Sequence, residues 1–254
     1  MERVTCLLRG SLFHPGKSYG VLERLFKAGD FSLYYFRAKK GDGFTVDADE
    51  NERLVFSTDG GVVVNGETLG VKDMIYAPRG AGLRVVSISE SSIYLAEARG
   101  FTERRQFVKR FNESVKVESG QDCYARVIFL MVSESDHVDR FLAGYTEGVG
   151  GSWTSYPPHR HDGKPEAYIF YGMAPGFGVQ LLMDDEGEDA YIVRDGDVVL
   201  IERGYHPNVG TSLSGIKYAW VIAAPPGKRD LSVEIHPLFS SVPLRTTHLK
   251  VKEG

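Results

Sequence analysis

The chain has 254 residues, 42% of them apolar and 25% charged, which is enough for one large hydrophobic core or two smaller ones. Its net charge of -4 and isoelectric point near 6.0 argue against binding to nucleic acid or to an acidic membrane surface, because neither polyanion attracts a mildly acidic protein. No stretch approaches the roughly 20 apolar residues that span a bilayer, and the apolar run at residues 4–8 is too short for a signal-peptide core.

The cysteine content points to a reducing compartment. The two cysteines, Cys6 and Cys123, are far apart in the sequence and show no metal-binding spacing. We expect free thiols, with a single disulfide as the alternative. Together with the composition, this predicts a cytoplasmic protein.

Short apolar or alternating runs recur along the chain and predict β-strands. Turn residues such as Asn65-Gly66 and Asp195-Gly196 separate them, and the chain has 29 glycines. The predicted strands cover residues 31–37, 53–57, 62–65, 74–77, 83–88, 93–98, 126–132, 167–171, 179–183, 190–193, 198–201 and 217–223. No long amphipathic helix is apparent, although residues 18–26 and 136–142 could each form one or two helical turns. The pattern indicates an all-β sandwich or barrel.

The second half carries a metal-binding pattern, His159-x-His161-x4-Glu166, followed by Gly204-Tyr205-His206. In an extended segment His159 and His161 point to the same face, because side chains alternate with a period of two. Glu166 opens another predicted strand and His206 follows a turn, so both can face the same interior. A His-x-His pair alone is more often structural. Three imidazoles and one carboxylate in one compact segment predict a site for a divalent metal.

An internal repeat relates the two halves of the chain. The matched pieces are residues 73–82 with 197–206, and residues 45–56 with 159–170. In this alignment Thr45, Asp47 and Gly82 stand where the second half has histidines, and Glu52 stands in the frame of Glu166. We predict two similar β domains, residues 1–110 without metal ligands and residues 111–254 with the metal site.

Four ordered motifs in residues 148–209 carry a resemblance to a known family. The motifs are GSWTSYPPHRHD at 151–162, PGFGVQ at 175–180, RDGDVVL at 194–200 and GYHP at 204–207. They resemble the 5-deoxy-glucuronate isomerase family of inositol catabolism and, more distantly, the uronate ketol-isomerases of pectin breakdown. The resemblance implies two cupin domains (jelly-roll, or double-stranded β-helix) in one chain. It places the metal ligands on His159, His161, Glu166 and His206.

The implied reaction is an aldose–ketose isomerisation of 5-deoxy-D-glucuronate to 2-deoxy-5-keto-D-gluconate. A proton must move between adjacent carbons through a cis-enediolate, whose charge a metal with an open position can stabilise. We expect one divalent ion per chain, Zn²⁺ first, with Mn²⁺ or Fe²⁺ as alternatives. The candidates for proton transfer are Glu166, Tyr168, which shares its strand face, and Tyr156.

A uronate also needs groups that bind its carboxylate and hydroxyls. Gln180 and Tyr205 lie in the matched motifs, and a cation is expected to bind the carboxylate. The cationic candidates are Arg194, Lys217, Lys164 and Arg160, of which Arg160 is favoured least because it should point away from the two histidines.

Other functions are compatible with the same ligand set. The pectin-pathway ketol-isomerase is the first alternative, and an Fe-dependent dioxygenase or a sugar-binding module are alternatives of other classes. We expect a homo-oligomer whose partner is a small-molecule uronate, with no nucleic acid and no membrane.

Overall fold

The protein is all-β, as predicted. The computed structural model describes residues 10–211, 215–246 and 250–251. Within these residues the helical elements are three single 3-10 turns, η1 (Phe111–Glu113), η2 (Asp122–Tyr124) and η3 (Pro237–Phe239). No helix in this part of the chain is long and apolar enough to cross a membrane.

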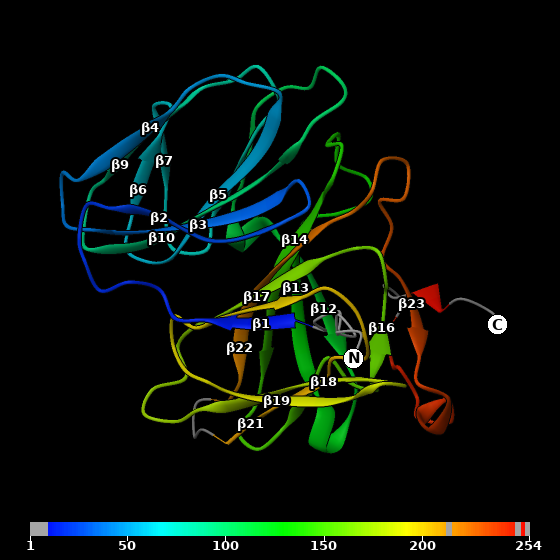
Figure 1. The fold of residues 1–254 in the computed structure, drawn as a ribbon. Coiled ribbons are helices and arrows are strands. Elements are labelled where there is room, and N and C mark those ends of the chain that lie inside the picture. The colour runs from blue at the N-terminus through cyan, green and yellow to red at the C-terminus, as the bar shows by residue number, and fades with distance from the viewer. Residues whose placement is uncertain (1–9, 212–214, 247–249, 252–254) are drawn as a thin grey trace, which may run out of the picture.

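Residues 22–109 form two facing sheets, called the first barrel below (Figure 1). The six-stranded sheet contains, in spatial order, β11 (Phe107–Lys109), β8 (Met74–Ala77), β5 (Asn51–Asp59), β10 (Ser91–Arg99), β3 (Phe31–Ala38) and β2 (Leu22–Ala28). The four-stranded sheet contains β4 (Gly43–Val46), β9 (Leu83–Ser87), β6 (Val62–Val64) and β7 (Glu67–Leu69). The core between them is built largely from branched aliphatic residues such as Val55, Val62 and Val85.

The rest of the described chain forms the second barrel. Its seven-stranded sheet contains β1 (Gly10–Phe13), β20 (Val198–Ile201), β17 (Glu166–Phe170), β22 (Lys217–Ala223), β14 (Phe141–Gly148), β13 (Arg126–Val132) and β12 (Val115–Ser119). Its four-stranded sheet contains β15 (Trp153–Thr154), β21 (Asn208–Gly210), β18 (Gly178–Asp184) and β19 (Gly187–Val193). A three-stranded sheet of β16 (His159–Arg160), β23 (Ser232–Ile235) and β24 (Lys250–Val251) completes it.

The two large sheets pack against each other and form a third core between the barrels. Phe31 and Phe56 of the six-stranded sheet belong to the same core as Ala167 and Ile169 of β17. Because side chains alternate along a strand, the remaining residues of β17 face the interior of the second barrel. Strand alternation therefore directs Glu166 and Tyr168 inward.

One strand crosses between the two halves of the chain. β1 pairs with β20, with Gly10 opposite Ile201, whereas the other described strands up to residue 109 pair only with one another. The predicted division at residue 110 had placed residues 10–13 with the first half, but their hydrogen bonds place them in the second sheet system. The organisation into two cupin domains stays a prediction.

Every predicted strand overlaps an observed one, but the two short helices were wrong. The segment 18–26 runs into β2, and the segment 136–142 is a turn that leads into β14. In β2 the register shifts between Arg24 and Phe26, so that Leu25 and Phe26 are both buried. This bulge breaks the period of two that would have identified the strand.

The predicted alignment of the halves was wrong by one residue on β5. Ala77 and Ile201 match in the repeat; Ala77 pairs with Arg53, whereas Ile201 pairs with Glu166. Arg53, not Glu52, therefore occupies the position of Glu166. A slip of one residue reverses the face of a strand, so Glu52 points toward the second barrel and not into the first.

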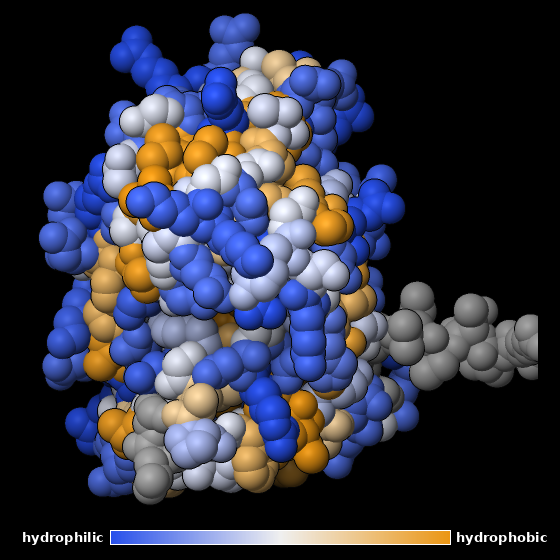
Figure 2. All heavy atoms as spheres, turned by 90° about the vertical axis from the view of Figure 1, so that its left-hand side faces the viewer, coloured by the Kyte–Doolittle hydropathy of each residue, from blue (hydrophilic) through white to orange (hydrophobic). Residues whose placement is uncertain are grey.

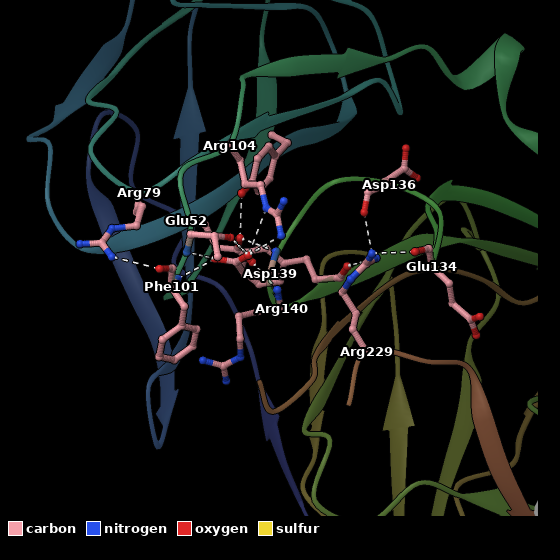
Figure 3. Close-up of polar contacts among 12 residues, drawn as sticks. Glu52, Arg79, Phe101, Arg104, Glu134, Asp136, Asp139, Arg140 and Arg229 are labelled. Atoms are coloured by element: carbon pink, nitrogen blue, oxygen red, sulfur yellow. Dashed lines mark hydrogen bonds and ion pairs between the residues drawn. The ribbon is translucent and has the colours of Figure 1, made fainter. Parts of the chain in front are cut away.

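Glu52 instead joins the two halves of the chain (Figure 3). It is fully buried, and its carboxylate accepts hydrogen bonds from the Tyr76 hydroxyl at 2.8 Å and from the backbone N–H groups of Asp139 at 3.0 Å and Arg140 at 2.8 Å. Burial raises the pKa of Glu52 more than these hydrogen bonds lower it. The Arg140 guanidinium adds an ion pair of 2.5 Å with Asp30.

The outer surface is mixed in character. Figure 2 shows the face on the left of Figure 1, where apolar side chains form small groups between hydrophilic ones. Cys123 is exposed and free, which agrees with the expected thiol, and Cys6 lies outside the described residues.

Candidate metal site and its cavity

Four predicted metal ligands meet inside the second barrel. His159 begins β16, His161 follows that strand, Glu166 begins β17, and His206 lies in the loop after β20. The backbone N–H of His206 donates to the His159 carbonyl at 3.3 Å, which ties the two segments together. The four residues are 7%, 8%, 4% and 0% exposed in chain order, so the cluster is buried.

Three of the four can offer ligand atoms to one ion. One ligand atom each from His161, Glu166 and His206 lies within 4.8 Å of the others, the one such group among the described residues. Glu166 Oε2 is 3.0 Å from His161 Nε2 and 3.6 Å from His206 Nε2. The ring of His159 lies beside them, with its centroid 4.9 Å from that of His206.

The imidazole rings are held in the orientation that metal ligands need. The Nδ1 atoms of His159, His161 and His206 lie 3.0, 3.1 and 2.9 Å from the carbonyl oxygens of residues 157, 164 and 204. A carbonyl can only accept, so each Nδ1 carries the proton and each Nε2 presents a lone pair. Burial lowers the pKa of His159 well below its usual range and that of His206 to about 4, so both rings are neutral at pH 7.

These contacts fit a bound cation. His161 Nε2 lies 3.0 Å from the Glu166 carboxylate, a contact that is favourable when a proton or a metal cation lies between the two atoms. His206 Nε2 is buried without a hydrogen-bond partner, which is unusual for a polar atom in a protein interior. Imidazole nitrogen and carboxylate oxygen are together the donor set of many zinc and manganese sites.

A cavity opens from this cluster toward the seven-stranded sheet. It contains about 660 Å³ of space not filled by atoms, part of it open to solvent. Inward side chains of β13, β14, β17 and β22 form its floor, and residues 230–233 close one side. Trp220, Ile222 and Leu130 supply apolar walls, while Thr146 and Ser155 supply hydroxyl groups. The cavity can therefore hold a small polar molecule beside the cluster.

The structure brings some of the predicted catalytic and binding residues to this cavity and leaves others outside. Tyr168 lines it and donates a hydrogen bond to Ser155 at 3.2 Å. Tyr156 does not line it, because its ring packs against Tyr124 and Trp153. Gln180 is buried elsewhere, where its amide donates a hydrogen bond to the carbonyl of His206 at 2.9 Å and so helps to hold the loop that carries His206.

Tyr205 also lies outside the cavity. Its hydroxyl donates to Glu234 at 3.2 Å, and the Arg160 guanidinium lies 4.9 Å above its ring. Arg160 further pairs with Glu234 at 2.7 Å, so it points away from the two histidines, as expected.

The predicted carboxylate-binding cations are not in the cavity. Arg194 is exposed against the ring of Phe177, and Lys217 lies on the other face of β22 from the inward Tyr218. Lys164 is buried at the rim but pairs with Asp230 at 2.7 Å.

The cation that does line the cavity is Arg126, which the sequence reasoning missed. It begins β13 and shares the inward face with Ile128 and Leu130. An arginine in phase with the apolar residues of a strand was the signal that could have identified it.

The first barrel has a different arrangement at the corresponding place. Arg53 is fully buried there and forms ion pairs with Asp49 at 2.6 Å and Glu97 at 3.0 Å. Its Nη1 also donates to the carbonyl of Ala81, which matches Tyr205 in the repeat. A guanidinium thus occupies the interior position from which Glu166 contributes to the cluster in the second barrel.

The fold is that of a cupin-like all-β protein, and a buried histidine–carboxylate cluster lies inside its second barrel. Residues 26–242 match the KduI/IolB family, and the chain belongs to this family.

Two curated relatives show what the family includes. The chain is 26% identical over 170 residues to a 4-deoxy-L-threo-5-hexosulose-uronate ketol-isomerase of Cereibacter sphaeroides, covering 65% of this chain and 62% of the relative. It is 28% identical over 166 residues to a 5-deoxy-glucuronate isomerase of Geobacillus kaustophilus, covering 60% of this chain and 54% of the relative. The matched part of the chain thus spans less than two thirds of either relative.

Solved structures share the fold. An IolB-like protein from Salmonella typhimurium superposes with a TM-score of 0.79 at 18% identity, over 91% of this chain and 98% of that one. A Bacillus subtilis oxalate decarboxylase superposes with a TM-score of 0.62 at 10% identity, over 86% of this chain and 78% of that one. At these identities the likeness concerns the fold alone.

Proposed function

We propose that this protein is a metal-dependent aldose–ketose isomerase that acts on a deoxy-uronate. The observation that carries the proposal is that His161, Glu166 and His206 meet in the interior, beside a cavity with apolar walls and hydroxyl-bearing residues. The names of the two relatives support it, because both are isomerases of uronates. Our first candidate substrate is 5-deoxy-D-glucuronate, converted to 2-deoxy-5-keto-D-gluconate. The match to the Cereibacter relative favours 4-deoxy-L-threo-5-hexosulose-uronate as the second.

Different residues of the site would bind the metal and transfer the proton. His161, Glu166 and His206 would hold one divalent metal, with His159 beside them as the fourth ligand. A bound metal would supply Lewis-acid stabilisation of the negative charge that develops when a proton leaves the carbon next to the carbonyl. Tyr168 and Glu166 line the cavity and are the candidates to move that proton. Ser155, which also lines the cavity, accepts a hydrogen bond from Tyr168.

The finer features belong to the same proposal. Zn²⁺ is the metal we propose, with Mn²⁺ or Fe²⁺ as alternatives, since all three accept imidazole and carboxylate ligands. We also propose that the enzyme works in the cytoplasm as a homo-oligomer of two-cupin chains.

The test is turnover of the purified protein on both deoxy-uronates without oxygen or nicotinamide. A chelator should abolish activity and Zn²⁺ or Mn²⁺ should restore it, because isomerisation changes no overall oxidation state. The His206→Ala variant should lose metal and activity together, whereas His14→Ala, a change at a 70% exposed side chain, should lose neither. Oxygen uptake would instead indicate a dioxygenase, and sugar binding without turnover a binding module.

A further inference from the structure

Arg126 places a positive charge inside the cavity. It is only 5% exposed, and it lines the cavity together with Ile128 and Leu130 of the same strand. Asp230 also lines the cavity, but Lys164 holds its carboxylate at 2.7 Å. The charge of Arg126 is therefore not neutralised by the acidic group at the rim.

The partners of Arg126 differ from those of the other buried arginines. The described residues include three buried arginines, and two of them form ion pairs with carboxylates. These pairs are Arg53 with Asp49 and Glu97, and Arg140 with Asp30. Arg126 pairs with no carboxylate of the described chain; its Nη1 donates to the Tyr124 carbonyl at 3.1 Å. A buried charge without a counter-ion is costly, and proteins keep such charges where a ligand supplies the partner.

The backbone beside Arg126 is shaped to accommodate its side chain. Gly120 has a φ of +76°, and a Cβ on this residue would lie 2.9 Å from Arg126 Nη1 and 2.2 Å from the Tyr124 carbonyl oxygen. Glycine thus leaves the space in which the guanidinium meets that carbonyl. One nitrogen is fixed in this way, and the rest of the guanidinium remains available to the cavity.

Arg126 and the metal-ligand cluster border the same cavity. Arg126 lines this cavity together with His159, His161 and Glu166 of the cluster. The hydroxyls of Thr146 and Tyr218 line the same cavity. A ligand that suits this space carries a carbonyl, hydroxyl groups and an anionic group.

We propose that Arg126 binds the substrate carboxylate and makes the site select sugar acids over neutral sugars. The inference rests on the proposed function and names the residue that recognises its substrate class. A guanidinium can donate two parallel hydrogen bonds to a carboxylate, and an apolar surrounding strengthens them.

The test compares binding of D-glucuronate and D-glucose to the zinc-loaded protein by calorimetry, together with turnover of 5-deoxy-D-glucuronate. Arg126→Gln should weaken D-glucuronate binding and lower kcat/KM by roughly 10- to 100-fold, the usual effect of losing hydrogen bonds to a charged group. Zinc content and the weak binding of D-glucose should stay unchanged. Arg126→Lys should fall between, because an ammonium keeps the charge but not the bidentate geometry. Arg194→Gln, the same change at an exposed arginine outside the cavity, should behave like the wild type.

Two results would overturn the inference. One is an Arg126→Gln variant that binds D-glucuronate as tightly as the wild type. The other needs no variant: wild-type protein that prefers D-glucuronate over D-glucose by no measurable factor. If the wild type binds D-glucuronate through Arg126 but isomerises neither deoxy-uronate, the proposed reaction fails and the carboxylate site stands.

Discussion

Replacing Glu52 with alanine should strongly destabilise the junction between the two halves of the chain. The carboxylate of Glu52 is fully buried and accepts three hydrogen bonds, from the Tyr76 hydroxyl and from the backbone N–H groups of Asp139 and Arg140. Each donor left buried without a partner costs roughly 1–3 kcal/mol. Burial of the Glu52 carboxylate is itself unfavourable, as its raised pKa indicates, so its removal offsets part of this loss. We therefore expect a loss of about 3–5 kcal/mol in the free energy of unfolding.

Urea denaturation followed by far-UV circular dichroism and tryptophan fluorescence measures this loss. With a slope of about 2–3 kcal/mol/M, the midpoint should fall by roughly 1–2 M. Both tryptophans, Trp153 and Trp220, lie in the second barrel, so fluorescence reports on that half while dichroism reports on both. Glu50→Ala is the matched control, because Glu50 forms an exposed ion pair with Arg99 and should contribute no more than about 1 kcal/mol. Equal midpoints for the two variants would refute the reasoning.

Further predictions concern the metal, the proton path, the first barrel and pH. Elemental analysis should find one divalent ion per chain, lost in His161→Ala; two ions per chain would contradict the account. Tyr168→Phe should keep the metal and lower kcat roughly 10²–10⁴-fold if Tyr168 moves the proton, and an unchanged kcat would exclude it from that role. Arg53→Leu should cost about 3–5 kcal/mol in urea denaturation without changing metal content, because it removes a fully buried guanidinium that pairs with the half-buried Glu97. Metal loss in this variant would show that the two barrels are coupled. The pKa of Glu52 is raised in the folded state, so ionisation of this carboxyl destabilises the fold. The free energy of unfolding of the wild type, compared with that of Glu52→Gln, should therefore fall as the pH rises from the ordinary glutamate pKa through the raised one. A difference between the two proteins that stays constant with pH would contradict this.

Local sequence patterns predicted most strands and the metal cluster, because both depend on alternation within a few residues. The motif around His159 and His161 could be placed on one face from spacing alone, and Glu166 followed on the next long strand. The position of β1 beside β20 could not be predicted, since nothing in residues 10–13 specifies a partner almost two hundred positions away.

Two errors concerned properties that contacts between distant segments decide, namely strand register and burial. The repeat alignment slipped by one residue on β5 and so assigned Glu52 the position that Arg53 occupies. Arg126 lies outside the matched motifs, and its importance as a cation depends on the burial that the barrel provides. Register and burial are set by contacts between distant segments, and a single sequence does not display them.

The most direct test of the central claim is isomerisation in deuterated water. Zinc-loaded protein is incubated without oxygen with each of the two deoxy-uronates, and the product is followed by NMR, with the metal-free His206→Ala variant as the control. The account predicts a ketose product that carries deuterium at the carbon that receives the proton, formed only by the metal-loaded protein. Conversion of neither deoxy-uronate by the loaded protein, or conversion at the same rate by the control, would contradict it.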